Sequence, residues 1–160
     1  EGYLPPMSNL SKRDKVSLCY GYGLQTTLIE LVNAYSIFYS EGKLRPLSLI
    51  VNNSSEDTEQ IISPDLSIKM KDMLTDAVRK GTGSKAKVKG IDISGKTGTV
   101  QKLGEKGYKE VSHNALFIGQ ASSENRNLIV GIIVRDAQKN GSGGGDVAAP
   151  SFARFINKVY

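Results

Sequence analysis

The stretch Gly90-Ile91-Asp92-Ile93-Ser94-Gly95-Lys96-Thr97-Gly98-Thr99-Val100-Gln101 decides how this 160-residue sequence is interpreted. Its Ile-Asp-Ile run and its β-branched residues alternate as expected for a β-strand. Because successive side chains of a strand point to opposite faces, Lys96 and Gly98 should share one face, and Thr97 and Thr99 the other. A glycine at position 98 would let a peptide-like ligand approach the edge of the strand closely.

The same stretch also fits the phosphate-loop pattern G-x-x-x-x-G-K-[ST], from Gly90 to Thr97. A phosphate loop requires a helix that begins at the Lys-Thr pair, because the free N–H groups of that helix bind the phosphates. The residues that follow show no helical stripe of apolar positions. A P-loop nucleotide hydrolase is therefore the less favoured alternative.

Two further segments of the second half are typical of strands. Residues 115–121 and 128–136 are rich in β-branched residues, and together with 91–102 they predict three antiparallel strands joined across 103–114 and 122–127. Residues 128–134 are apolar on both faces, which predicts a central strand or one covered by helices on each side.

Three helices are expected around these strands. Thr27 and Glu30 have capping-box spacing ahead of an apolar segment, which predicts a buried helix ended by Gly42. Residues 63–65 (Ser-Pro-Asp) begin a second helix, closed at 79–81, whose methionines are expected in the core. The last helix begins near residue 149. It is expected to bury Phe152, Phe155, Ile156 and Val159.

The remaining segments are interpreted as connections. Residues 1–25 are expected to be irregular, 44–51 to form a short edge strand, 52–60 to be a solvated loop and 141–145 to be a flexible loop. The elements together predict a single α+β domain: helix, helix, three antiparallel strands, helix.

The composition excludes several classes of function. The chain has 21 Lys or Arg and 16 Asp or Glu, which gives a net charge of +5. One cysteine, Cys19, excludes an internal disulfide, and one histidine, His113, argues against a zinc site, so neither metal nor cofactor is expected. No nucleic-acid-binding signature accompanies the basic residues, and no apolar run reaches the roughly 20 residues of a membrane span.

Five segments, in order, resemble the C-terminal half of the transpeptidase domain of class B penicillin-binding proteins, most closely the division-specific peptidoglycan D,D-transpeptidases. The segments are Gly21-Tyr22-Gly23-Leu24 with Thr26-Thr27, Gly42 with Arg45-Pro46-Leu47, Gly81-Thr82-Gly83 with Ala86, Gly90 to Gln101 around the K-T-G motif, and Gly144-Gly145-Asp146-Val147-Ala148-Ala149-Pro150 with Phe152. This resemblance implies an antiparallel three-stranded sheet packed against helices, as part of a β-lactamase/transpeptidase-like α/β/α sandwich.

The resemblance also implies site residues. Members of the family acylate an active-site serine with a stem peptide that ends in D-Ala-D-Ala, and β-lactams mimic that terminus. By similarity, Lys96 supports proton transfer and attracts the terminal carboxylate, which the hydroxyls of Thr97 and Thr99 bind. The backbone N–H of Thr99 would be an oxyanion-hole donor, and Gly98 would let the ligand lie along the strand.

Two residues of the following hairpin are weaker candidates. Tyr108 stands where relatives often carry a tyrosine that lines the pocket, and a binding role is weighed against an exposed loop aromatic. His113 stands where some relatives have a second tyrosine, but without an acidic partner nearby in sequence it is expected to be an ordinary loop residue.

Two of the family's three motifs, S-x-x-K and S-x-N, do not stand where the family has them. Residues 84–87 have S-x-x-K spacing but lie in a glycine-rich basic loop, and the S-x-N matches at 112–114 and 123–125 follow the K-T-G strand. The chain is therefore expected to be the C-terminal part of one transpeptidase domain, with the N-terminal part of that domain as its partner. Alone, it should neither crosslink peptidoglycan nor bind penicillin covalently.

The resemblance finally implies a setting. The parent protein would be anchored in the cytoplasmic membrane and act on its extracytoplasmic (periplasmic) face, with division-machinery proteins as partners, whereas this chain would be soluble. A non-catalytic β-lactam-sensing or scaffold domain of the same fold is the alternative. An uncovered sheet edge and helical face should give marginal stability or association.

Overall fold

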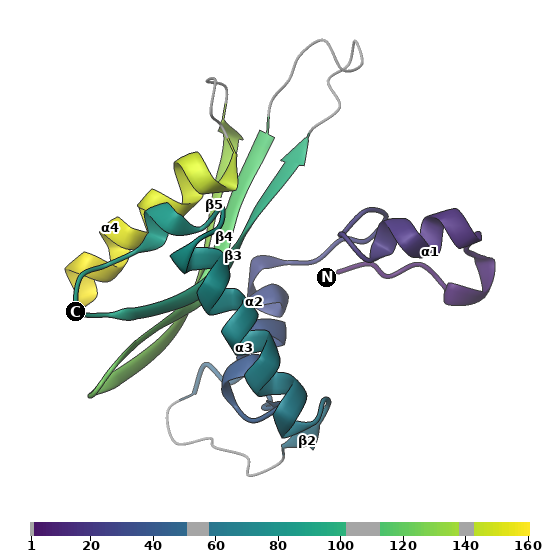
Figure 1. The fold of residues 1–160 in the computed structure, drawn as a ribbon. Coiled ribbons are helices and arrows are strands. Elements are labelled where there is room, and N and C mark those ends of the chain that lie inside the picture. Colours follow the sequence, from purple (N-terminus) through teal and green to yellow (C-terminus); the bar gives the residue numbers. More distant parts are fainter. Residues whose placement is uncertain (1, 51–57, 102–112, 138–142) are drawn as a thin grey trace.

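A computed structural model describes residues 2–50, 58–101, 113–137 and 143–160 (Figure 1). The helices are α1 (Lys12–Leu18), α2 (Leu28–Ser36), α3 (Pro64–Arg79) and α4 (Ala149–Val159), with the shorter helical turns η1 (Met7–Asn9), η2 (Ile37–Tyr39), η3 (Ser84–Ala86) and η4 (Gly144–Ala148). The strands are β1 (Lys43–Leu44), β2 (Glu59–Gln60), β3 (Asp92–Gln101), β4 (His113–Ser123) and β5 (Arg126–Ala137). None of the helices in these ranges is long and apolar enough to cross a membrane.

The main sheet is antiparallel, with the strand order β3-β4-β5. The three predicted strands are confirmed, and so is the α+β class. β4 is the central strand, and β5 lies at an edge of the described sheet with α2 against one face and α4 against the other. The two-sided apolar run of residues 128–134 thus reflects helices on both faces, not a central position in the sheet.

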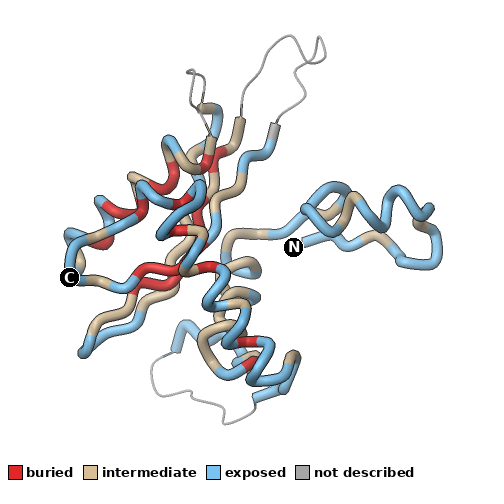
Figure 2. The backbone as a smooth tube through the Cα atoms, in the orientation of Figure 1, coloured by how far each residue is buried: buried red, intermediate tan, exposed pale blue. Residues whose placement is uncertain are grey.

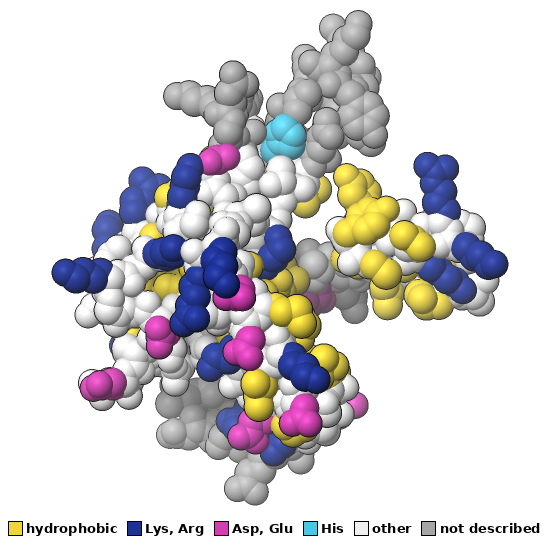
Figure 3. Space-filling view, in the orientation of Figure 1, with side chains coloured by type: hydrophobic (Ala, Val, Ile, Leu, Met, Phe, Trp, Pro, Cys, Tyr) yellow, Lys and Arg dark blue, Asp and Glu magenta, His cyan; other side chains and the backbone are white. Residues whose placement is uncertain are grey.

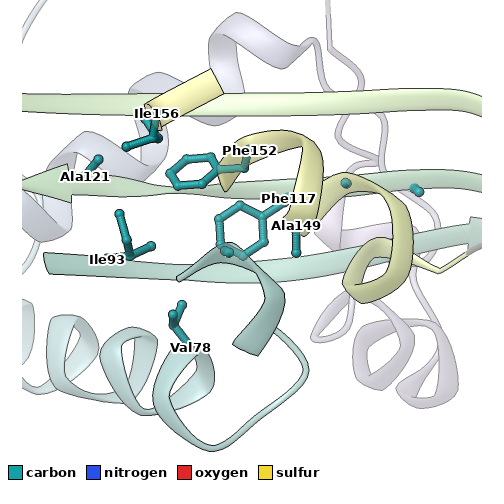
Figure 4. Packing of buried hydrophobic residues seen from close by; sticks show 10 residues of the cluster. Val78, Ile93, Phe117, Ala121, Ala149, Phe152 and Ile156 are labelled. Atoms are coloured by element: carbon teal, nitrogen blue, oxygen red, sulfur yellow. The ribbon is translucent and has the colours of Figure 1, made fainter. Parts of the chain in front are cut away.

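The core lies between the sheet and α4 (Figures 2 and 4). Phe117 of β4 and Phe152 of α4 are fully buried, with ring centroids 4.7 Å apart and ring planes inclined by 57°. Val78 from the end of α3 and Ile156 of α4 complete the contact. The last helix therefore buries Phe152 and Ile156 as predicted, but Phe155 is 43% exposed because it lies on the outer face of α4.

Helix α3 connects the two sides of the sheet. The Ser63 side chain accepts a hydrogen bond from the Leu66 N–H, which confirms the predicted N-cap. The Ser67 hydroxyl lies 3.1 Å from the carbonyl oxygen of Phe38 in η2, while Val78 enters the core on the α4 side. The prediction that all methionines of this helix are in the core is wrong, since Met73 is 59% exposed.

Helix α2 begins with the predicted capping box between Thr27 and Glu30. Backbone N–H groups of Thr27 and Gly2 hydrogen-bond the Glu30 carboxylate and lower its pKa to about 2. The prediction of a buried helix is wrong, since none of its residues is fully buried. Leu28 and Val32 pack on Gly131 of β5, whereas Ile29 on another face is 55% exposed. The α-helix ends before Gly42, whose φ of +83° ends the η2 turn.

The N-terminal region contains a helix that the sequence analysis missed. Ser11 caps α1 with a reciprocal Ser11–Asp14 capping box, and the region extends away from the sheet as an arm (Figure 1). The predicted edge strand over 44–51 is reduced to the two-residue β1, paired with β2 at residues 59–60, which had been expected in a loop. Similarly, residues 144–145 begin the π-helical turn η4 instead of ending a flexible loop.

Candidate active site

Lys96 lies in the middle of β3, opposite Ile118 of β4. Its side chain is exposed, and its Nζ donates a hydrogen bond to the backbone carbonyl oxygen of Thr97 at 3.1 Å. The backbone stays extended from Asp92 to Gln101, so no helix begins at the Lys-Thr pair. The phosphate-loop alternative is therefore wrong, because its helix N-terminus is absent from this strand.

The hydroxyls of Thr97 and Thr99 lie on the other face of β3, as the period of two predicts. The Thr97 Oγ1 is 2.6 Å from the Thr82 Oγ1, in the loop between α3 and η3. The Thr99 Oγ1 accepts a hydrogen bond from the Gly144 N–H at 3.0 Å, at the start of η4. Both threonines of the K-T-G-T run are thus held in defined positions by neighbours that are distant in sequence.

The short turn η4 packs against this face of β3 and contacts the turn η3. Lys85 of η3 and Asp146 of η4 form an ion pair with an Nζ–Oδ1 distance of 2.7 Å. Gly144 packs directly on the sheet, and a Cβ built there would lie less than 3.0 Å from the carbonyl oxygens of Gly98 and Leu116. Glycine is required here for close approach, because β3 and β4 hold those carbonyls in place.

The Lys96 face of β3 carries a buried polar contact. Ser94, two residues before Lys96, is 4% exposed, and its hydroxyl donates to the Tyr39 hydroxyl at 3.0 Å. The Tyr39 hydroxyl also lies 3.3 Å from the Ser94 carbonyl oxygen. Burial raises the pKa of Tyr39 to about 12, and the hydrogen bond from Ser94 opposes part of that rise. Tyr39 thereby fixes η2 to the strand beside Lys96.

The raised pKa of Tyr39 predicts a loss of stability in alkali. An unfolded tyrosine loses its proton near pH 10, whereas folded Tyr39 retains it up to about 12. The folded state therefore binds more protons between these values, and the free energy of unfolding should fall as the pH rises from 10 to 12. Denaturant unfolding at several pH values would measure this, and Tyr39→Phe should reduce the slope. Tyr20→Phe is the control, because that ring is 65% exposed, and it should leave the slope of unfolding free energy against pH unchanged. A slope in Tyr39→Phe equal to that of the unmodified chain would contradict the prediction.

Of the two weaker candidates, Tyr108 and His113, the structure describes only His113. Tyr108 lies outside the described residues. The expectation that His113 is a loop residue is wrong: it is the half-buried first residue of β4, because it pairs with Gln101 of β3 and Ala137 of β5 next to a shift in register. Within the described ranges, no three His, Cys, Asp or Glu side chains form a group that could hold a metal ion. Thr82 was not predicted as a residue that positions Thr97. Its Gly-Thr-Gly motif is visible in the sequence, but the motif does not show which side chain the Thr82 hydroxyl contacts.

Comparison with known proteins places this arrangement in a family. The family model described as "Penicillin binding protein transpeptidase domain" matches residues 1–157. The chain belongs to this family. The family assignment made from the five sequence segments is thereby confirmed.

Individual relatives agree with the penicillin-binding protein family. The chain is 34% identical over 97% of its length to "Probable peptidoglycan D,D-transpeptidase PbpC" of Pseudomonas aeruginosa, and 32% identical over 93% to "Peptidoglycan D,D-transpeptidase FtsI" of Buchnera aphidicola. It spans 28% and 27% of the lengths of these two relatives. The apo transpeptidase domain of Burkholderia pseudomallei penicillin-binding protein 3 superposes with a TM-score of 0.86 at 29% identity, covering 99% of this chain and 49% of that one.

Proposed function

We propose that this chain is the C-terminal part of a serine-type peptidoglycan D,D-transpeptidase domain and supplies the wall of the site that holds the substrate's terminal carboxylate. The substrate class is a peptidoglycan stem peptide ending in D-Ala-D-Ala, and β-lactams would occupy the same wall. The parent protein would act at the extracytoplasmic face of the cytoplasmic membrane, together with division-machinery proteins.

The single observation that carries this proposal is the K-T-G strand, whose two threonine hydroxyls are held by hydrogen bonds. Lys96 projects from one face of β3, and the hydroxyls of Thr97 and Thr99 are held on the other by Thr82 and Gly144. A strand edge with a cation on one face and ordered hydroxyls on the other suits a ligand that lies along the edge and ends in a carboxylate. An extended peptide could then lie along the strand, in the manner of β-strand addition.

The proposed roles differ in their physical basis. A carboxylate at about 4 Å from the Lys96 ammonium would gain about 1 kcal/mol in bulk water and about 4 kcal/mol at an effective dielectric constant near 20. Lys96 is exposed in this chain, so its full effect requires other elements that exclude water from the site. Thr97 and Thr99 would bind the carboxylate, Gly98 would allow close approach, the Thr99 N–H would stabilise the oxyanion, and Tyr108 would line the pocket.

The nucleophile in this proposal comes from outside the 160 residues. The sequence places no S-x-x-K motif before α2 and has two later matches, at 40–43 and 84–87. The Ser40 hydroxyl donates a hydrogen bond to the Ser36 carbonyl oxygen at 2.8 Å, and Lys85 of the second match is paired with Asp146. We therefore expect a fluorescent penicillin to leave the isolated chain unlabelled after denaturing electrophoresis. Covalent labelling of the 160-residue chain would contradict this part of the proposal.

The proposal is tested in the gene and then in the protein. The reading frame upstream of Glu1 should encode an S-x-x-K motif followed by an S-x-N motif. The protein expressed from that frame should be acylated by a fluorescent penicillin, and Lys96→Ala should slow acylation about 10²–10⁴-fold, the range for removal of a proton-transferring group. Lys15→Ala on α1 is the matched control and should be acylated at the unchanged rate. A frame without the two motifs would overturn the enzymatic proposal in favour of a sensor or scaffold domain.

A further inference from the structure

A groove lies at the N-terminal end of β3. It has a volume of about 670 Å³ and is enclosed by the last turns of α3, the turn that leads into β3, and neighbouring residues of β4. This volume lies within the range of about 300–1,000 Å³ typical of small-molecule sites. Lys96, Thr97 and Thr99 are not among its lining residues, so the groove is separate from the proposed transpeptidase wall.

Part of the most basic segment of the chain lines the groove. Residues 79–89 include five Lys or Arg and no Asp or Glu, which equals the net charge of +5 of all 160 residues. The groove itself is lined by four basic side chains and two carboxylates, a net charge of +2. The basic ones are Lys71, Arg79, Lys87 and Lys89, and the carboxylates are Asp72 and Asp92. Blue side chains gather on the face formed around α3 and α4 in Figure 3.

The lining cations are available to a ligand. Lys80 and Lys85 of the basic segment form ion pairs with Asp76 and Asp146, but neither lines the groove. In the part of the chain that the structure describes, Lys71, Arg79 and Lys89 form no ion pair. The Lys87 ammonium donates one hydrogen bond, to the Arg79 carbonyl oxygen at 2.9 Å, and has two further N–H donors.

The frame of the groove is fixed before any ligand binds. Val88 and Ile91 form an isolated β-bridge around a turn in which Gly90 has a φ of +80°, and this turn carries Lys89. Val78 and Ile93, which are 2% and 7% exposed, form an apolar base. A preformed site loses less conformational entropy on binding than a mobile one.

We propose that this groove binds a ligand through a phosphate group. A phosphate carries up to two negative charges and several acceptor oxygens, which match the net charge of the lining and the donors of Arg79, Lys87 and Lys89. A single carboxylate would satisfy only part of this donor set. The two carboxylates at the groove, Asp72 and Asp92, repel the same ligand and so limit where its phosphate can lie. The phosphate could belong to a lipid headgroup or to a free phosphate compound.

Two probes distinguish these sources on the 160-residue chain. Inorganic pyrophosphate is titrated while backbone amide shifts are followed by NMR, and saturable shifts are expected at Lys89, Ile91 and Ile93. Sedimentation with vesicles of equal parts phosphatidylglycerol and phosphatidylcholine is compared with pure phosphatidylcholine. Pyrophosphate binding without vesicle binding supports a free phosphate compound. Preferential binding to the anionic vesicles that pyrophosphate displaces supports a lipid headgroup.

Variants separate a site from general charge. The double variant Arg79→Gln/Lys89→Gln should weaken binding at least about tenfold, since each residue donates a charged hydrogen bond. The matched control, Lys12→Gln/Arg13→Gln on α1, removes the same charge away from the groove and should bind unchanged. Asp72→Asn should tighten binding, because it removes a repelling carboxylate. Equal weakening in both double variants, or no binding of either probe by the folded chain, would overturn the proposal.

Discussion

Replacing Phe117 with alanine is expected to lower the free energy of unfolding by about 3–5 kcal/mol. The Phe117 ring is fully buried and contacts the Phe152 ring at a centroid distance of 4.7 Å. It also lies against one glycine of a strand and one glycine of a loop. A Cβ built on Gly95 would lie 2.7 Å from Phe117 Cζ, and one on Gly83 3.3 Å from Cε2, so the ring fills the space that these glycines leave. Its removal would leave a cavity beneath β3. Urea unfolding followed by circular dichroism measures the change.

A matched control is available on α4. Phe155→Ala removes the same side chain from a site that is 43% exposed, and it should cost much less than Phe117→Ala because it leaves no enclosed cavity. If Phe117→Ala does not fold, Phe117→Leu should give a measurable loss of about 0.5–3 kcal/mol, since it retains most of the volume. Equal losses of unfolding free energy for Phe117→Ala and Phe155→Ala would contradict the placement of the core around Phe117.

The sequence predicted best those elements whose signals are local. The strands follow from runs of β-branched residues, and the alternation of Lys96 and Thr97 across β3 follows from the period of a strand alone. The start of α3 was predicted correctly because Ser63 and Pro64 act within one turn of helix. Helix α1 could have been found in the same way, since Ser11 and Asp14 have the capping spacing that was used for Thr27 and Glu30.

What the sequence could not predict depends on contacts between distant segments. Glycines at 144 and 145 indicate a loop by propensity, but packing on β3 makes them the start of η4. The Thr82–Thr97 and Gly144–Thr99 hydrogen bonds join residues 15 and 45 positions apart, and no local pattern encodes such pairs. The family resemblance implied the residues that we propose for the site, whereas the structure shows what holds Thr97 and Thr99 in position.

Replacing Gly144 with alanine is expected to separate η4 from the K-T-G strand. The added Cβ would lie less than 3.0 Å from the carbonyl oxygens of Gly98 and Leu116, which β3 and β4 hold in place, so η4 must move instead. Overpacking of this kind costs about 1–3 kcal/mol. The move should also break the hydrogen bond from the Gly144 N–H to the Thr99 hydroxyl. NMR shifts of the Thr99 methyl and amide groups would report that loss, alongside the free energy of unfolding.

The neighbouring Gly143 separates a local clash from a general effect of alanine in this turn. Its backbone is extended, with φ −73° and ψ 169°, and a Cβ built there meets only the Thr99 Oγ1, at 3.3 Å. That oxygen belongs to a side chain that can shift by a few tenths of an ångström, whereas the carbonyls above Gly144 cannot. Gly143→Ala should therefore be far milder in both measurements. Equal changes of the Thr99 shifts and of the unfolding free energy in both variants would show that close packing at residue 144 does not position Thr99. The ion pair between Lys85 and Asp146 would then be the contact that holds η4 against β3.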